Sequence, residues 1–213
     1  MELKNERDFI VEYGKKLIKS HLTKGTGGNI SIFNESRKVM AISPSGMDYF
    51  ETKPEDIVLM DLDEHIIEGN RKPSSEAKMH IAIYKNRNDA AAVIHTHSTF
   101  ATTIATLNWE IPSLHYLVAF AGTKVPCAKY ASYGTIELAE NTVKSLGSDY
   151  KATLLANHGL ISLGRNISEA FAVAEIIEFM AEIYYRTKSI GTPVLLSKEE
   201  MLKMIDKFKT YGQ

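Results

Sequence analysis

The 213-residue chain has few of the features that mark secreted, membrane and nucleic-acid-binding proteins. Its single cysteine, Cys127, excludes an intramolecular disulfide. No apolar run reaches membrane-spanning length, and the N-terminal segment MELKNERDFI lacks the apolar core of a signal peptide. The formal net charge is −1 and no block of like charges occurs, so we expect neither a nucleic-acid partner nor a membrane partner. These absences together predict a cytoplasmic protein.

The composition is that of an ordinary globular domain. Hydrophobic residues make up 44% of the chain and charged residues 24%, and the length suffices for one α/β domain with a sizeable core. No repeat, linker or low-complexity segment divides the sequence. We therefore predict a single domain over residues 1–213.

Hydrophobic periodicity predicts both helices and strands. Helical spacing covers residues 3–22, 76–84, 100–107, 135–146, 167–187 and 198–208. Short β-type runs cover residues 30–33, 39–43, 57–61, 90–94, 152–156 and 160–163, and a further apolar run covers 114–120. Some strands follow one another through turns and others are separated by helices, so we predict one mixed sheet covered by helices.

Four residues indicate a metal site. His95 and His97 follow the buried run 90–94, and side chains two apart on a strand point to the same face. His158 follows the second apolar run, again at a strand end, and Glu76 opens a predicted helix. Three histidines and one carboxylate are typical ligands of a catalytic zinc or a related divalent ion. The pattern predicts one metal site at an edge of the sheet.

The plain interpretation of any one histidine is different. A lone histidine beside an apolar strand is usually a hydrogen-bonded residue of the core or rim. On that ground we interpret His21, His65 and His80 as ordinary helix or loop residues and leave His115 open. The paired spacing H-x-H makes a metal site as well supported as this interpretation, and the motif alone does not decide between the two.

Three short segments are suited to binding an anion. Gly27-Gly28-Asn29 can bring backbone N–H groups close to a ligand, and residues 43–46 form a turn with two hydroxyls. Ser74 and Ser75 precede a helix, whose first N–H groups favour negative charge. Each segment is also explained by turn or capping chemistry alone. Because Glu76 directly follows Ser75, an anion held there would lie beside the metal site.

The ordered motifs of the chain resemble those of the class II sugar-phosphate aldolase/epimerase family from end to end. These motifs are GTGGN at 25–29, SPSG at 43–46, KPSSE at 72–76, HTH at 95–97, IPSLHY at 111–116, GT at 134–135, NHG at 157–159 and KFKTYG at 207–212. The resemblance implies a three-layer α/β/α domain around a mixed, largely antiparallel sheet. It also implies a homotetramer with its active sites at subunit contacts.

The resemblance further implies roles for individual residues. One zinc ion per chain would be bound by His95, His97 and His158, with Glu76 as the fourth ligand or as an acid/base. Six residues would hold the substrate phosphate: Gly28, Asn29, Ser45, Gly46, Ser74 and Ser75. Tyr116 would donate a proton to the aldehyde oxygen, and Tyr133 and Tyr211 would line the aldehyde pocket. Tyr133 stands where the resembling aldolases carry phenylalanine, which alters this pocket.

The implied activity is zinc-dependent cleavage of a ketose 1-phosphate. L-Fuculose 1-phosphate would give dihydroxyacetone phosphate and L-lactaldehyde. The alternatives are L-ribulose-5-phosphate 4-epimerase, a dehydratase or other sugar-phosphate lyase, and a non-catalytic module like the adducin head. Glu76 and the segment 114–117 favour the aldolase over the epimerase, and the complete ligand set argues against the adducin-like module.

Overall fold

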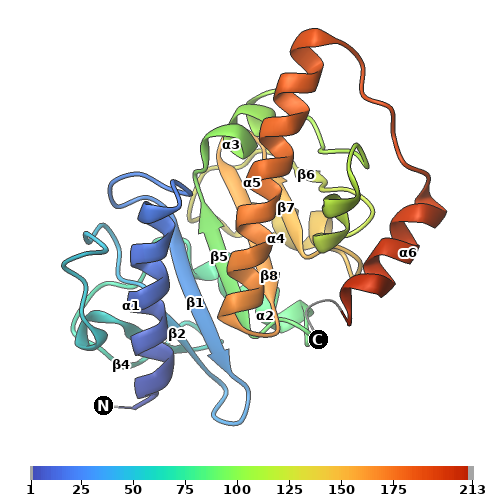
Figure 1. The fold of residues 1–213 in the computed structure, drawn as a ribbon. Helices are drawn as coiled ribbons and strands as arrows, with labels where there is room; N and C mark the ends of the chain where they lie inside the picture. The colour runs from blue at the N-terminus through green and yellow to red at the C-terminus, as the bar shows by residue number, and fades with distance from the viewer. Residues whose placement is uncertain (1, 211–213) are drawn as a thin grey trace.

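The computed structural model describes residues 2–210, which form a layered α/β domain (Figure 1). Its eight-stranded sheet has the order β4-β3-β2-β1-β5-β8-β7-β6. The strands are β1 (Asn29–Asn34), β2 (Val39–Ile42), β3 (Val58–Asp61), β4 (Ile66–Glu68), β5 (Ala92–Thr96), β6 (Cys127–Ala128), β7 (Ala152–Leu155) and β8 (Gly159–Gly164). The pair β6–β7 is parallel and the other neighbouring pairs are antiparallel. The predicted mixed, largely antiparallel sheet is confirmed.

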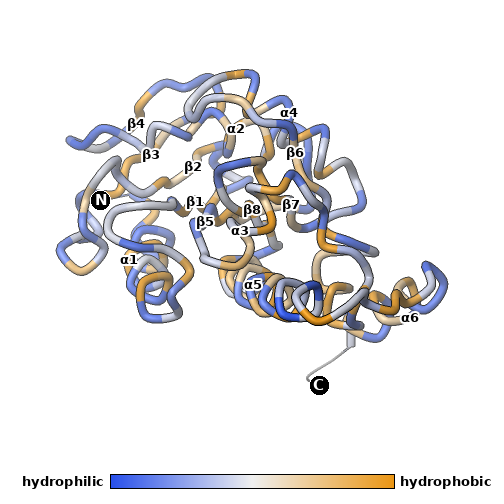
Figure 2. Tube along the Cα trace, turned by 90° about the horizontal axis from the view of Figure 1, so that it is seen from above, coloured by the Kyte–Doolittle hydropathy of each residue, from blue (hydrophilic) through white to orange (hydrophobic). Residues whose placement is uncertain are grey.

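Helices cover both faces of the sheet. They are α1 (Lys4–Lys19), α2 (Ala77–Asn86), α3 (Thr99–Thr106), α4 (Ile136–Leu146), α5 (Ile167–Ile190) and α6 (Lys198–Phe208), with short 3-10 helices η1 (Pro54–Asp56) and η2 (Tyr116–Phe120). Figure 2 shows α2 and α4 on one side of the sheet and α1, α5 and α6 on the other. The predicted three-layer α/β/α architecture is confirmed. None of the helices within residues 2–210 is long and apolar enough to cross a membrane.

The central strand β5 is buried on both faces. Val93 packs in the apolar cluster shared with Met79 and Ile83 of α2, whereas Ile94 packs in the cluster shared with Leu17 of α1. A strand covered by helices on both sides loses the alternation of apolar and polar residues, which explains the continuous run that the sequence shows. This burial holds the end of β5 rigidly in the middle of the sheet.

Strand register brings distant segments to that end of β5. Asn29, the first residue of β1, pairs with His95, and Thr96 pairs with Leu160 of β8. Because β1 and β8 are both antiparallel to β5, each begins where β5 ends. The turn from β7 to β8 and the loop before β1 therefore flank the two histidines of β5.

Several boundaries differ from the predictions. The sequence pattern predicts neither β4 nor β6, which are three and two residues long. The apolar run 114–120 contains the 3-10 helix η2. Helix α2 begins at Ala77 rather than Glu76, because Glu76 is its N-cap residue. The Ser74 hydroxyl does not cap the helix interior but accepts the Glu76 N–H at 3.2 Å.

Candidate active site

Three histidines meet where β5 ends beside the β7–β8 turn. His95 lies on β5, His97 comes just after it, and His158 lies in the turn. One ring nitrogen from each lies within 4.8 Å of the others. The Nε2 atoms of His95 and His97 are 2.9 Å apart. The fold thus gathers the three histidines that the sequence pattern assigns to a metal, at the end of a central strand.

Glu76 joins this group from the N-cap of α2. Its carboxylate is buried, with Oε2 3.3 Å from His95 Nε2 and Oε1 3.5 Å from His158 Nε2. Asn29 Nδ2 donates to Oε2 at 3.0 Å. Oε1 has no hydrogen-bond partner among the described residues. A buried carboxylate oxygen without a donor is costly, so this atom indicates a missing positive partner.

The protonation of the histidines supports the same conclusion. Burial lowers the pKa of His95 well below its usual value, and His158 and His97 lower it further. Burial, followed by His158, also lowers the pKa of His97. Because His95 Nδ1 donates to the Leu160 carbonyl oxygen at 3.0 Å, its Nε2 lone pair faces the other side chains.

These donor atoms fit a metal ion. A hydrogen bond between His95 and His97 would also explain the short distance between their Nε2 atoms. It would leave Glu76 Oε1 without a partner. A divalent cation satisfies all four groups together, and three imidazoles with one carboxylate are ligands that zinc accepts. The cluster could therefore hold such an ion, with Glu76 either bound to it or beside it.

An unusual turn positions His158. Asn157 has a φ of 53°, in the left-handed region that asparagine tolerates better than most residues. Its N–H donates to the Ala105 carbonyl oxygen at 3.1 Å, and the His158 N–H donates to Leu155 at 3.0 Å. The backbone of the turn thus directs the third imidazole toward the other two.

A cavity of about 360 Å³ opens next to this cluster, within the size range of small-ligand sites. All six residues predicted to bind phosphate line it, together with Glu76, His97, His158 and Tyr133. The complete lining is Thr26, Gly27, Gly28, Asn29, Pro44, Ser45, Gly46, Ser74, Ser75, Glu76, His97, Tyr133 and His158. The structure therefore places the three segments predicted to bind an anion around one space that is also lined by Glu76, His97 and His158.

Backbone bonds join the segments of this cavity to one another. The Ser74 N–H donates to the Ser43 carbonyl oxygen at 3.1 Å, and the Ser45 N–H donates to Lys72 at 3.0 Å. Gly28 has a φ of 73°, and a Cβ there would lie 2.6 Å from the His95 carbonyl oxygen. Within residues 2–210, no lysine or arginine lines the cavity. An anion would be bound by hydroxyls, amides and backbone N–H groups.

The three predicted tyrosines are placed differently. Tyr133 lines the cavity and is 71% exposed. Tyr116 begins η2, is 46% exposed, and does not line the cavity of its own chain. Its ring lies 6.2 Å from that of Phe208 on α6. Tyr211 lies outside the described residues.

Of the four other histidines, His21 and His65 are exposed, His115 is half-buried and His80 is buried. His65 is exposed and bonds to Asp61, and His115 accepts the Leu117 N–H at the start of η2. His80, which the sequence pattern does not distinguish, is fully buried and bonds to Asn29 next to the cluster. The signal that could have found it is its spacing of four from Glu76, which places both on one helix face.

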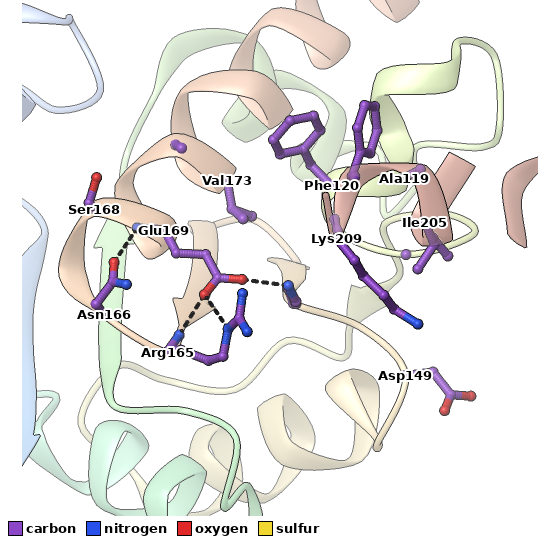
Figure 3. A pocket seen from close by; sticks show the side chains of 15 residues that line it. Ala119, Phe120, Asp149, Arg165, Asn166, Ser168, Glu169, Val173, Ile205 and Lys209 are labelled. Atoms are coloured by element: carbon purple, nitrogen blue, oxygen red, sulfur yellow. Dashed lines mark hydrogen bonds and ion pairs between the residues drawn. The ribbon is translucent and has the colours of Figure 1, made fainter. Parts of the chain in front are cut away.

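A second cavity, of about 490 Å³, lies between η2, the start of α5 and α6. Figure 3 shows Glu169, Arg165 and Asn166 of its wall joined by hydrogen bonds. Lys151 also pairs with Glu169. One carboxylate is thus paired with two cations, and none of the histidines of the cluster lines this cavity. The larger cavity is therefore separate from the candidate active site.

Comparison with known proteins agrees with this geometry. Residues 8–185 match the family described as class II aldolase and adducin N-terminal domain. Over the full length of both proteins, the chain is 57% identical to 5-deoxy-D-ribulose 1-phosphate aldolase of Bacillus thuringiensis serovar kurstaki. It is 40% identical to L-fuculose phosphate aldolase of Escherichia coli K12, over 95% of this chain and 94% of that protein. A solved structure of L-fuculose 1-phosphate aldolase matches with a TM-score of 0.96 and 46% identity, covering 98% of each chain.

The chain therefore belongs to the class II aldolase and adducin N-terminal domain family. Its relatives of high identity are aldolases, so it is a class II aldolase, a carbon–carbon lyase of carbohydrate metabolism. Class II aldolases depend on a metal, in agreement with the three-histidine cluster. The predicted family, fold and enzyme class are confirmed. The roles assigned to individual site residues, zinc itself and the particular sugar stay predictions.

Proposed function

We propose that this enzyme cleaves 5-deoxy-D-ribulose 1-phosphate to dihydroxyacetone phosphate and acetaldehyde. The observation that carries the proposal is the single cavity in which the anion-binding segments adjoin Glu76 and the histidines. Such a space suits a substrate with a phosphate at C1 and two oxygens at C2 and C3. The aldolase that is 57% identical over the full length, and is named for this sugar, supports the choice of substrate.

L-Fuculose 1-phosphate, the substrate predicted from the sequence, stays as the second candidate. It is supported by the aldolase structure that matches with a TM-score of 0.96. The two sugars are identical in connectivity from C1 to C4 and differ by one CHOH group before the terminal methyl. The phosphate and metal-binding residues would therefore treat both alike, and the rim around Tyr133 would distinguish them.

The residues that bind the substrate phosphate would position the whole substrate. Gly28, Asn29, Ser45, Gly46, Ser74 and Ser75 would donate to the phosphate and the adjoining oxygens. Bonds from these donors to an anion are stronger than bonds between neutral groups, and they fix the register of the sugar in the cavity. The C2 and C3 oxygens would then face the histidines.

Bond cleavage requires stabilisation of the charge that develops at C3. A divalent ion, which we propose to be one zinc per chain, supplies this stabilisation as a Lewis acid when bound by His95, His97 and His158. The C4 hydroxyl gives its proton to the phenolate oxygen of Tyr116, the electrons of the C3–C4 bond pass toward the C2 carbonyl, and the aldehyde leaves. Glu76, protonated from solvent beforehand, then delivers its proton to C3 of the dihydroxyacetone phosphate, and Tyr116 returns its proton to solvent.

We assign to Tyr116 the transfer of the proton at the aldehyde oxygen. Because Tyr116 is exposed and lies outside the cavity of its own chain, the assignment requires a second subunit. We therefore propose that the enzyme is a homotetramer whose active sites lie at subunit contacts, with Tyr116 and Tyr211 completing a neighbour's site. The mechanism requires no Schiff-base lysine, and no lysine lines the cavity in the described part of the chain.

The test is a comparison of specificity constants. The zinc-loaded enzyme is given 5-deoxy-D-ribulose 1-phosphate, L-fuculose 1-phosphate and L-ribulose 5-phosphate, and both dihydroxyacetone phosphate and the aldehyde are measured. We expect the highest kcat/KM on the first sugar. A higher value on L-fuculose 1-phosphate would select the second candidate. Epimer formation without release of dihydroxyacetone phosphate would overturn the proposal, and sedimentation equilibrium tests the tetramer.

A further inference from the structure

A line of buried hydrogen bonds runs from the core to Glu76. Tyr84 OH lies 2.7 Å from Ser31 Oγ, and Ser31 Oγ lies 2.6 Å from His80 Nδ1. His80 Nε2 lies 2.5 Å from Asn29 Oδ1, and Asn29 Nδ2 donates to Glu76 Oε2 at 3.0 Å. Each of these five side chains is buried, and Ser31 and His80 are inaccessible to solvent. We call this line the Tyr84–Glu76 relay.

The relay follows from the periods of a helix and a strand. Glu76, His80 and Tyr84 recur every four residues, so they lie on one face of the segment that includes α2. Asn29 and Ser31 are two apart on β1 and point to one face of the sheet. Where these two faces meet, polar residues alternate between helix and strand. The relay is therefore built into the packing of α2 on β1.

Donation along the relay has one direction. The Glu76 carboxylate can only accept, so the Asn29 amide directs its NH₂ group to Glu76 and its oxygen to His80. His80 must then donate from Nε2. Burial lowers the pKa of His80 to about 3, with a smaller contribution from His95, so the ring is neutral and its Nδ1 accepts from Ser31. The Ser31 oxygen is left to accept from Tyr84.

We infer that His80 is a positioning residue of the active site, which fixes the side-chain amide of Asn29 so that its NH₂ group holds Glu76. This inference rests on the functions proposed for Asn29 and Glu76. An asparagine amide without such a partner can turn over, since its two ends differ little in shape. With His80 in place, turning the amide would set its oxygen against the Glu76 carboxylate and its NH₂ group against the His80 N–H. Both contacts are repulsive.

For catalysis, the consequence of the fixed Asn29 amide is that the Glu76 carboxylate is held in the correct orientation. Asn29 belongs to the anion-binding segments and its side chain bonds to the Glu76 carboxylate, whereas Ser74 bonds only to the Glu76 backbone N–H, so the Asn29 amide links phosphate binding to proton transfer. Loss of the orientation should lower kcat, because the proton delivered to C3 depends on Glu76. It should leave metal content nearly unchanged, because His80 contacts none of the three histidines by hydrogen bond within residues 2–210.

Two variants of His80 separate positioning from packing. In His80→Gln the amide nitrogen reaches the place of Nε2 and can still donate to Asn29, whereas the shorter side chain of His80→Asn reaches only the place of Nδ1. We expect kcat within about 3-fold of wild type for the glutamine variant. For the asparagine variant we expect a loss of about 10–150-fold, which corresponds to a weakened bond to a charged group. Thr142→Val is the control for packing, since it removes a fully buried hydroxyl outside the relay that donates to the Leu138 carbonyl oxygen within α4 and to Met79 Sδ.

A direct readout does not depend on activity. In ¹⁵N-histidine-labelled wild-type enzyme, NMR should show His80 protonated at Nε2 and unprotonated at Nδ1 from pH 5 to 8. Protonation at Nδ1, or wild-type kcat in a folded, metal-containing His80→Asn variant, would overturn the inference. If the asparagine variant does not fold, the NMR result decides. If the tautomer is as stated but no ketose 1-phosphate is cleaved, the proposed function fails and the orientation of Asn29 stands.

Discussion

Replacing Gly159 with alanine should damage both the fold and the metal-binding group. Gly159 opens β8 directly after His158, against the end of β5. A Cβ at this position would lie 2.2 Å from the Thr96 carbonyl oxygen. It would also lie 3.1 Å from His97 Cδ2 and 3.3 Å from His95 Cε1. The nearest obstacle is backbone rather than a flexible side chain, so the two strands must separate.

The expected loss of stability in Gly159→Ala follows from the cost of overpacking. Extra atoms in a well-packed core cost about 1–3 kcal/mol, and a contact with strand backbone belongs at the upper end. For a domain of this size each kcal/mol lowers the Tm by about 2–4 °C, so Gly159→Ala should lower it by about 6–12 °C. Because two imidazoles must also shift, zinc affinity should fall by about 10–100-fold, as when a group that orients a ligand is lost.

Calorimetry and zinc titration of the purified variant measure these effects. Gly191→Ala is the matched control, since a Cβ at Gly191 meets nothing within 4 Å. The control should keep the wild-type Tm and zinc affinity. If Gly159→Ala also keeps both, the close approach of β8 to β5 is not what holds the histidines, and the reasoning is refuted.

Four further predictions concern single residues of the site. His95→Ala should reduce bound zinc, measured by mass spectrometry, from the value of about one ion per chain expected for the wild type. Full activity of the chelated wild-type protein would contradict the need for zinc. Glu76→Gln should keep zinc but lose about 10²–10⁴-fold in kcat, and joint loss of zinc would make Glu76 chiefly a ligand. Ser75→Ala should cost about 1.5–3 kcal/mol in binding the phosphorylated but not the unphosphorylated ketose, compared by KM. Because the pKa of His80 falls from 6.5 to about 3 on folding, the unfolded chain binds a proton that the native chain lacks, so stability decreases as pH falls below 6.5. The loss should be about 2 kcal/mol at pH 5 in urea unfolding, and a His80→Gln variant should lack it.

Much of the fold could be predicted because its elements carry strong periodic patterns. The long helix α5 and the buried strand β5 have apolar residues in sufficient number to be recognised in isolation. The strands β4 and β6 could not be recognised, since two or three residues are too few to show a period. Helix η2 was equally ambiguous, because a short apolar run is compatible with several structures.

The site could be predicted in part. The spacing of His95 and His97 determines that both lie at the end of one strand, whatever the rest of the fold. His158 is joined to them because it follows a second apolar run at a strand end, and Glu76 is joined to them by residue type and by family resemblance. The sequence pattern alone leaves His80 as an ordinary residue, since its partners Asn29 and Ser31 are about fifty residues away in sequence.

The sequence by itself determined which side chains share a face of a strand or a helix, because backbone geometry sets those periods locally. Only the tertiary structure decided which faces meet. The antiparallel pairing of β5 with β1 and β8 places Asn29 and the His158 turn beside His95. The packing of α2 on β1 brings Glu76 and His80 to the same point. These arrangements depend on strand register and on burial of both faces of the sheet, which involve residues far apart in the chain, so no local pattern contains them.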